Sequence, residues 1–329
     1  MRVLVLGGTR FIGRAIVHEL LAHGHEVLLV HRGDHEDPSL TTIPHLHCNR
    51  RELARERSVL DAYAPEGVVD TCAMTGPDAE AVLALLATGV RRVALSSVDV
   101  YRAFGSVVEE TETDLVPIDE DSPLREKALP PRPVASLRGW DYDPGAYEKL
   151  QVEAAYRRVG GVALRLPAVF GEHDYQRREE PVLRRVRHGR PVPVGPGTFL
   201  WSMGYVGDIA QGVRLALEAT GVEGEVFNLC ERRTPTVLQR FRRIAEAAGA
   251  RVEFVPVPEG QLPDDLQVTR SMAQHVLVDA SKARRVLRWR ESDPDEALRR
   301  SVCWHLAHPP EEPDPGFEAD DRALAARAW

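Results

Sequence analysis

The sequence predicts an α/β fold with a doubly wound parallel sheet. Short apolar stretches alternate with helical periods along the first half of the chain, which is typical of βαβ units. The clearest helical period runs from about Phe11 to Ala22. Its Ile12, Ile16 and Leu20 form one apolar stripe that can lie on a sheet. Expected strands cover residues 2–6, 26–30, 67–73, 91–97, 161–167 and 225–229.

The composition is that of a globular protein without a general attraction for polyanions. The 329 residues are 43% hydrophobic and carry a formal net charge of -8, so neither nucleic acid nor an anionic membrane is an expected partner. The four cysteines are scattered, with no spacing typical of zinc ligands, and no apolar run is long enough for a signal peptide or a membrane span. We therefore expect a reduced, cytoplasmic protein with no metal site.

Two stretches lack a regular period. Residues 104–144 are acidic and proline-rich and lie between core-type segments, which predicts a long functional loop. Residues 309–329 are also acidic, which predicts a frayed tail. Between these stretches, helices are expected near residues 208–219, 238–248 and 281–287.

A glycine-rich turn joins the first expected strand to the first expected helix. The stretch "VLGGTRFIG" (5–13) lies where the N-terminus of a helix offers backbone N–H groups to an anion such as a dinucleotide pyrophosphate. The strand before it, the helix after it and a second strand about twenty residues on make this motif specific. We expect the cofactor to contact Gly7, Thr9, Arg10, Phe11, Ile12 and Gly13.

The charges around this turn favour NADP over NAD. Arg10 stands beside the expected ribose, and the second strand ends in "VHRG", which places Arg32 where an NAD site usually offers a carboxylate. Two guanidinium groups would stabilise a 2′-phosphate. NAD stays the alternative, with both arginines merely solvated, because Asp34 and Glu36 follow closely.

The order of short motifs resembles that of the extended and atypical short-chain dehydrogenases, also called the NAD-dependent epimerase/dehydratase family. The spacing of Gly7, position 10 and Gly13 resembles the family's GxxGxxG, with arginine as the middle residue. Further similar stretches follow in the family's order: "VVDTCAM", "ALSSVDVYRA", "VPIDEDSPLR", "LRLPAVFGE", "GRPVPV", "GYVGDIA", "VFNL" and "VDASKARRVLRW".

The resemblance implies a Rossmann fold with a smaller C-terminal substrate domain. Residues 1–170 together with about 202–230 would bind the dinucleotide, and residues 171–201 with 231–308 would bind the substrate. Where the expected strands end, the resemblance places further residues beside the cofactor: Cys72, Ala73, Ser96 and Pro167.

The resemblance also assigns catalytic roles. Ser97 stands four residues before Tyr101, like the family's serine that hydrogen-bonds the substrate oxygen. Lys149 precedes "LQVE" and matches the catalytic lysine, which binds the nicotinamide ribose. The alternatives are a backbone-capping role for the Ser97 hydroxyl and a surface ion pair between Lys149 and Glu153.

The family's tyrosine is missing from its usual place. The family pairs tyrosine with lysine at i and i+4, one helical turn apart, but Gly145 stands four residues before Lys149. Tyr147 is two residues away, about 200° around a helix, and is expected to point away from the cofactor. A shifted register that pairs Tyr147 with Gln151 stays open, although glutamine supplies no charge.

Three groups are candidates to replace this tyrosine. Asp99 lies two residues beyond Ser97, on the same face if the strand continues, and would need an apolar pocket to hold it protonated. An exposed carboxylate is its alternative role. Tyr142 precedes the helix and could place a phenol over Gly145, with loop packing as its alternative role. A water held by Ser97, or a hydroxyl of the substrate, is the third candidate.

These observations favour an NADP-dependent oxidoreductase that moves hydride to or from a carbonyl or secondary-alcohol carbon of a small-molecule substrate. A sugar epimerase or dehydratase that uses NAD transiently is the near alternative. A non-catalytic dinucleotide sensor and an RNA-binding protein are two others, since "GGTRFIG" is also similar to the opening of chloroplast stem-loop RNA-binding proteins. Family members commonly pair through helices at the sheet edge, so a homodimer is a further expectation.

Overall fold

The central sheet has the predicted doubly wound, parallel arrangement. This computed structural model describes residues 1–130 and 143–326. The strands follow the order β10-β6-β5-β4-β1-β2-β3, and each neighbouring pair is parallel. The strand order reverses between β1 and β4, the switch point at which such sheets bind ligands. The strands are β1 (Arg2–Leu6), β2 (Glu26–His31), β3 (His45–His47), β4 (Gly67–Asp70), β5 (Arg91–Ser97), β6 (Val162–Leu166) and β10 (Val226–Asn228).

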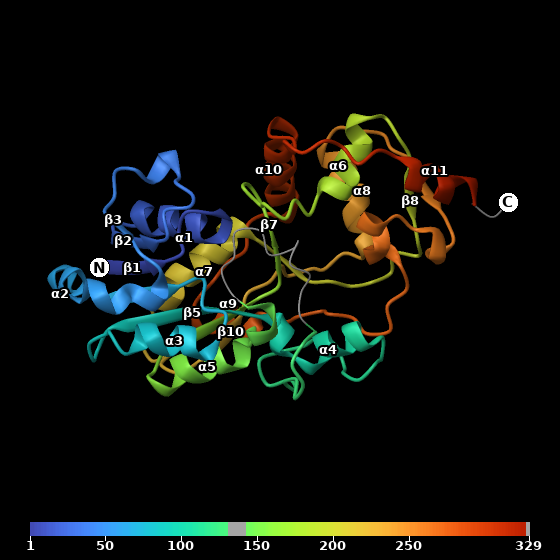
Figure 1. Ribbon diagram of the computed structural model, residues 1–329. Coiled ribbons are helices and arrows are strands. Elements are labelled where there is room, and N and C mark those ends of the chain that lie inside the picture. The colour runs from blue at the N-terminus through green and yellow to red at the C-terminus, as the bar shows by residue number, and fades with distance from the viewer. Residues whose placement is uncertain (131–142, 327–329) are drawn as a thin grey trace.

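Helices cover both faces of this sheet (Figure 1). On one face α1 (Phe11–Ala22) packs against α7 (Val206–Glu218), and on the other α3 (Gly76–Leu83) packs against α5 (Lys149–Arg158). The strands are therefore buried on both sides, which explains their nearly continuous apolar sequences. The segments η2 (Arg50–Glu56) and α2 (Arg57–Tyr63) lead from β3 to β4. Among the described residues, no helix combines the length and the apolar character needed to cross a membrane.

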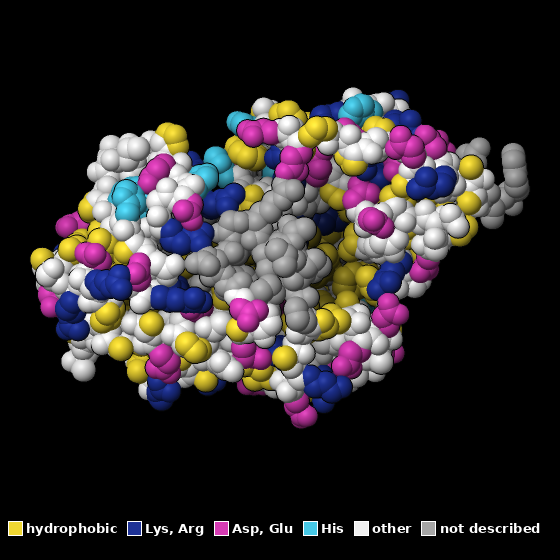
Figure 2. All heavy atoms as spheres, in the orientation of Figure 1, with side chains coloured by type: hydrophobic (Ala, Val, Ile, Leu, Met, Phe, Trp, Pro, Cys, Tyr) yellow, Lys and Arg dark blue, Asp and Glu magenta, His cyan; other side chains and the backbone are white. Residues whose placement is uncertain are grey.

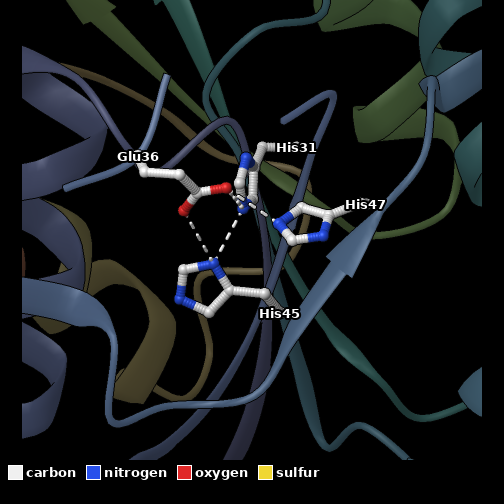
Figure 3. Close-up of side chains that lie close together, drawn as sticks. All are labelled: His31, Glu36, His45 and His47. Atoms are coloured by element: carbon white, nitrogen blue, oxygen red, sulfur yellow. Dashed lines mark hydrogen bonds and ion pairs between the residues drawn. The ribbon is translucent and has the colours of Figure 1, made fainter. Parts of the chain in front are cut away.

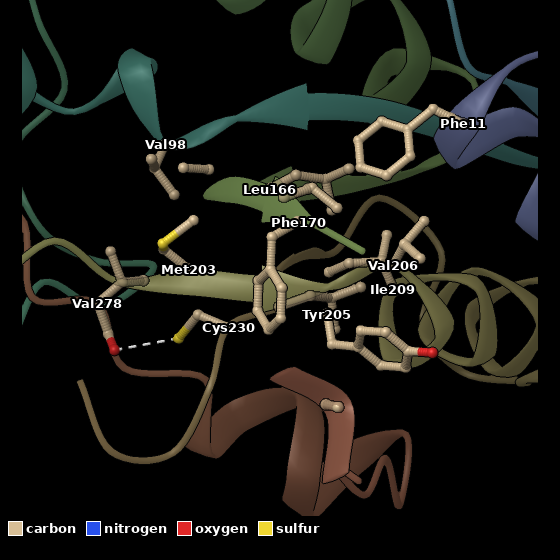
Figure 4. Close-up of a cluster of buried hydrophobic side chains, with 14 of the residues drawn as sticks. Phe11, Val98, Leu166, Phe170, Met203, Tyr205, Val206, Ile209, Cys230 and Val278 are labelled. Atoms are coloured by element: carbon tan, nitrogen blue, oxygen red, sulfur yellow. Dashed lines mark hydrogen bonds between the residues drawn. The ribbon is translucent and has the colours of Figure 1, made fainter. Parts of the chain in front are cut away.

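A second region of shorter strands and helices stands beside the sheet (Figure 1). One apolar cluster contains Phe11 of α1, Leu166 of β6 and Met203 of the strand β9 (Met203–Tyr205) in the second region (Figure 4), so the two regions share a core. The second region contains two pairs of strands. β7 (Ala168–Phe170) pairs with β9 (Met203–Tyr205), and β8 (Val192–Val194) pairs with β11 (Phe254–Pro256). The helices of this second region are α6 (Glu180–Arg187), α8 (Val237–Ala247), α10 (Pro294–Ala307) and α11 (Glu318–Ala325), whereas α9 (Ser281–Val286) lies beside β10 of the central sheet (Figure 1).

Two stretches that were expected to be irregular contain helices. α4 (Arg102–Glu109) occupies the start of the expected loop at 104–144. The expected frayed tail contains α11, whose Asp320 forms an ion pair with the buried Arg185 of α6 at 2.7 Å. The prediction of a frayed tail is therefore wrong for this segment, because a contact with a distant helix holds it in place.

Candidate functional site

The turn between β1 and α1 requires glycine at two positions. Gly7 has a φ of +82°, a backbone conformation that residues with a side chain rarely adopt. A Cβ at Gly13 would lie 2.0 Å from the carbonyl oxygen of Gly7. The hydrogen-bond ladder of α1 includes Arg14 N–H donating to Arg10 O at 3.1 Å, so the amides before Arg14 lie outside the ladder. The helix N-terminus thus offers N–H groups and a positive dipole end to an anion.

A cavity of about 390 Å³ lies at this turn and at the carboxyl ends of β1, β2 and β4, a volume in the range of small-molecule sites. Tyr175, from the segment after β7, also lines it. The Tyr175 ring stands edge-on to Phe11, with centroids 6.1 Å apart, and its centre lies 5.2 Å from the guanidinium of Arg10. Sequence reasoning missed Tyr175, because only the fold brings it to the turn. The expected cofactor residues that line the cavity are Gly7, Thr9, Arg10, Phe11, Ile12, Gly13, Arg32 and Cys72.

The charges around the cavity are mixed. Arg32 forms an ion pair with Asp34 at 3.0 Å, and both residues line the cavity. Arg50 forms an ion pair with Asp70 at the end of β4, with 2.6 Å between Nη2 and Oδ1. Although burial opposes ionisation of Asp70, the Arg50 guanidinium holds the pKa of this carboxyl below its usual value. Arg10, Arg32 and Arg51 line the cavity and are exposed, so they are the cations nearest to a ligand bound there.

Lys149 is the first residue of α5 and is only 5% exposed. Its Nζ donates to the carbonyl oxygens of Ala73 at 2.6 Å and Leu95 at 3.0 Å, near the ends of β4 and β5. Burial lowers the pKa of this ammonium, and the carboxylates of Asp70 and Asp99 oppose the shift. Because Leu95 lines the cavity, the lysine head lies directly behind the cavity wall.

Tyr147 does not stand on a helix, so the prediction that places it about 200° around the helix from Lys149 is wrong. α5 begins only at Lys149, and Tyr147 lies before it with extended backbone (φ -60°, ψ 118°), at the end of the turn η5 (Pro144–Ala146). The angle of about 200° applies only within a helix and does not hold here. The phenol donates to Oδ2 of Asp99 at 2.7 Å. Gln151, its partner in the shifted register, lies on the exposed part of α5.

Asp99 reaches the site through a turn and not through a continued strand. β5 ends at Ser97, whose Oγ accepts a hydrogen bond from Asp99 N–H at 3.2 Å and caps the 3-10 turn η3 (Val98–Val100). Ser97 therefore has a capping contact in this structure and stands next to the Tyr147–Asp99 pair. Asp99 is fully buried, so the alternative of an exposed carboxylate is wrong. Tyr142 lies outside the described residues.

A further ion pair, which the sequence did not reveal, holds the Tyr147–Asp99 pair in place. Arg125 donates from Nε to the carbonyl oxygen of Asp99 at 3.0 Å and from Nη2 to Glu148 at 2.5 Å. Glu148 also accepts Leu150 N–H at 3.0 Å and so caps α5. Arg125 thereby joins η3 to the start of α5, on either side of Tyr147.

Three residues expected beside the cofactor do not line the cavity: Ala73, Ser96 and Pro167. Ser96 donates to Glu153 of α5 at 2.5 Å, and Glu153 makes two hydrogen bonds to Arg165 of β6 at 2.9 and 2.8 Å. Ser96 faces this buried network because successive strand residues point to opposite faces of the sheet. Pro167 is buried between β6 and β7. The surface ion pair of Lys149 with Glu153 is also wrong, because Glu153 is buried and paired with Arg165.

The sheet order, the glycine turn and the cavity at the switch point define the class: a doubly wound α/β protein with a site suited to a dinucleotide. More narrowly, the chain belongs to the NAD dependent epimerase/dehydratase family, whose model matches residues 3–230.

Two relatives show how the family varies. The chain is 26% identical to the chloroplast stem-loop binding protein of 41 kDa b from Arabidopsis thaliana, over 99% of this chain and 85% of that protein. It is 28% identical to a 3-diazoavenalumate denitrifying reductase from a Streptomyces species, over 67% of this chain and 74% of that protein.

Solved structures with the same fold include two enzymes of sugar nucleotides. The dTDP-glucose 4,6-dehydratase of Bacillus anthracis, in complex with NAD, has a TM-score of 0.70 at 16% identity, over 94% of this chain and 97% of that one. The UDP-glucose 4-epimerase of Thermotoga maritima has a TM-score of 0.67 at 19% identity, over 93% of this chain and 99% of that one. At these identities the likeness shows the fold alone.

Proposed function

We propose that this protein is an NADP-dependent oxidoreductase that transfers hydride to or from a carbonyl or secondary-alcohol carbon of a small molecule. The observation that carries the proposal is the hydrogen bond of 2.7 Å between Tyr147 Oη and Asp99 Oδ2. It supplies a proton-transfer pair after β5, close enough to the buried Lys149 for the Asp99 charge to act on it. A relative that is named a denitrifying reductase supports a reductase more generally, without pointing to a carbonyl substrate.

The residues around the glycine turn fit an NADP-type cofactor. The first-turn amides of α1 would hold the pyrophosphate, and the exposed Arg10 and Arg32 would meet a 2′-phosphate. Lys149 would meet the nicotinamide ribose, which is the role of the matching lysine in other members of the family. The bound nicotinamide would exchange hydride at its C4 carbon.

The Tyr147–Asp99 pair can move one proton in either direction. In the observed form the phenol donates to the carboxylate, so an alcohol proton passed to the Tyr147 oxygen would release the phenol proton to Asp99. Carbonyl reduction would run the same transfer in reverse: Asp99 would protonate the Tyr147 oxygen while the phenol proton goes to the substrate.

The experiment is transfer of a labelled hydride from NADPH to a panel of ketones, with the Tyr147→Phe and Asp99→Asn variants. We expect kcat/KM to fall by about 10²- to 10⁴-fold in either variant, the usual contribution of a positioned acid. Tyr63→Phe is the matched control, because the Tyr63 hydroxyl donates to Glu26 O at 2.9 Å, at the opposite end of the sheet. Full activity in Tyr147→Phe would refute the assignment of the proton donor.

An epimerase or dehydratase is the second candidate, supported by the reactions named for the family. Such an enzyme regenerates its cofactor within one cycle, so dinucleotide that stays bound through purification would favour this candidate. Free exchange of NADPH with solution would favour the reductase.

RNA binding is a third candidate, supported by the Arabidopsis relative that matches almost the whole chain. The net charge of -8 weighs against it. On the face drawn in Figure 2, the described basic side chains are interspersed with acidic ones. Retention of a stem-loop RNA that weakens steeply with salt would be required to favour this candidate.

A further inference from the structure

Three histidines and a glutamate meet at the edge of the sheet, next to the cavity (Figure 3). His31 ends β2 and is paired in register with His47 of β3. His45 and His47 stand two residues apart on β3, so their side chains share one face of the sheet. Glu36, from the loop after β2, completes the group. One ligand atom from each of the four residues lies within 4.8 Å of all the others.

We propose that this cluster binds one divalent metal ion of borderline softness, Zn²⁺ above all. Three imidazole nitrogens and one carboxylate oxygen are a donor set that zinc favours. With bonds of about 2.0–2.1 Å, the ligand atoms of a tetrahedral site are about 3.4 Å apart. The observed separations lie on both sides of this value: 2.8 Å for His31 Nε2 to His45 Nδ1, 2.9 Å for His47 Nε2 to Glu36 Oε1, 3.5 Å for His45 Nδ1 to Glu36 Oε2 and 3.9 Å for His31 Nε2 to Glu36 Oε1.

Hydrogen bonds around the cluster hold two of the ligands in place. His45 Nε2 lies 2.9 Å from the carbonyl oxygen of Leu40, so Nε2 carries the proton and Nδ1 keeps its lone pair toward the cluster. The loop that carries Glu36 is anchored by the next residue, Asp37, which accepts hydrogen bonds from Arg14 and from Ser39 N–H. The glutamate is thus presented by a fixed loop.

Metal binding moves one proton within the cluster. Without metal, Gly33 N–H donates to His31 Nδ1 at 3.2 Å, which leaves the ring proton on Nε2, facing His45. When Nε2 binds metal, this proton moves to Nδ1 and the contact with Gly33 is lost.

A site closed by four protein ligands is structural rather than catalytic. Here the ion would tie the edge strand β3 and the loop that carries Glu36 to the end of β2. His31 also lines the cavity, beside Arg32. Metal would therefore stiffen the part of the cavity that receives the adenosine half of a dinucleotide, a consequence that rests on the proposed function. Metal binding itself does not depend on that function.

Calorimetric titration of the untagged, EDTA-treated full chain with ZnCl₂, in the absence of dinucleotide, tests the site. We expect one saturable site in the wild type. Glu36→Gln and His47→Ala should lower the affinity by more than about 100-fold, beyond the 10- to 100-fold typical of outer-shell partners. Both side chains are exposed, so these variants should keep the fold. His23→Ala, at the exposed end of α1, is the matched control and should keep the wild-type affinity.

Cobalt substitution provides a second readout. Co²⁺ in the wild type should give the strong visible absorption of a four-coordinate site, and Glu36→Gln should lose it. Absence of a saturable site, or equal affinity in the wild type and both variants, would overturn the proposal. NADPH titration of the metal-free wild type tests the proposed function separately, because the two titrations use different ligands.

Discussion

Single residues determine how closely α1 approaches the glycine turn and where the Tyr147 phenol lies. Because Gly13 has no Cβ, α1 can pack directly on the carbonyl of Gly7, and the first-turn amides then face the cavity. Tyr147 reaches Asp99 from a position just before α5 and not on it. One added carbon atom at Gly13 should therefore change the free energy of unfolding. Removal of the hydroxyl oxygen of Tyr147 should change the proposed activity.

Gly13→Ala tests the close approach of α1 to the turn. Its Cβ would meet a backbone oxygen that no flexible side chain can move away, so we expect a loss of about 3 kcal/mol in the free energy of unfolding, the upper part of the range for overpacking. Urea denaturation measures this loss. Gly105→Ala in α4 is the control, with no other atoms within 4 Å of its Cβ, and should be neutral or stabilising by about 0.5–1 kcal/mol. Equal stability of Gly13→Ala and the wild type would contradict the close packing.

At the level of elements, the start of α5 determines how Tyr147 lies relative to Asp99. Glu148 both caps this helix and pairs with Arg125, which in turn binds the carbonyl of Asp99. A helix that started one turn earlier would carry Tyr147 away from Asp99. The cap, more than the spacing of tyrosine and lysine, therefore sets the position of the phenol.

Glu148→Gln removes the charge but keeps an oxygen that can accept Leu150 N–H. The Arg125 side chain, 4% exposed, would lose its counter-charge. We expect the free energy of unfolding to fall by about 2 kcal/mol, between the values for surface and buried ion pairs, because the Glu148 side chain is 19% exposed. Chemical denaturation checks this, and the exposed Glu112→Gln should change stability by less than about 0.5 kcal/mol. An equally small change in Glu148→Gln would show that the pair does not organise this element.

Periodic elements could be predicted from the sequence, whereas elements held by distant contacts could not. β1, β5 and α1 follow local patterns of burial, and their predicted ranges match the structure. Arg125 lies in an acidic stretch, where a solvent-exposed side chain would be expected. It is buried because it contacts Asp99 and Glu148, which are distant in the sequence. His45 and His47 carried an available signal, since an H-x-H pattern in a strand places both rings on one face. His31 lies close to these two histidines because β2 pairs with β3, and no local sequence pattern determines this pairing.

On the scale of the whole molecule, the C-terminal segment stabilises the second region. The buried Arg185 of α6 pairs with Asp320 of α11 and with Asp265, so one guanidinium joins three separate segments. Figure 1 shows α11 next to β8, at the far side from the sheet. The acidic end of the chain therefore acts as part of the fold.

Asp320→Asn tests this docking. The Asp320 side chain is 1% exposed, so removal of its charge leaves Arg185 only partly compensated, and we expect a loss of about 3 kcal/mol in the free energy of unfolding. Asp321→Asn, the adjacent and largely exposed aspartate, should cost less than about 1 kcal/mol. Guanidinium denaturation of the two variants compares them directly. A similar small effect in both would mean that α11 does not contribute to the core.

Titration of the folded, purified protein with NADPH and with NADH, followed by nicotinamide fluorescence, tests most directly whether the glycine turn holds an NADP-type cofactor. We predict saturable binding of NADPH, at least about tenfold tighter than NADH, because one charge-assisted contact to a 2′-phosphate is worth roughly 1.5 kcal/mol or more. Arg32→Ala should remove most of this preference while NADH binding stays the same. Saturation by neither nucleotide, on protein that circular dichroism shows to be folded, would contradict the assignment of the cavity.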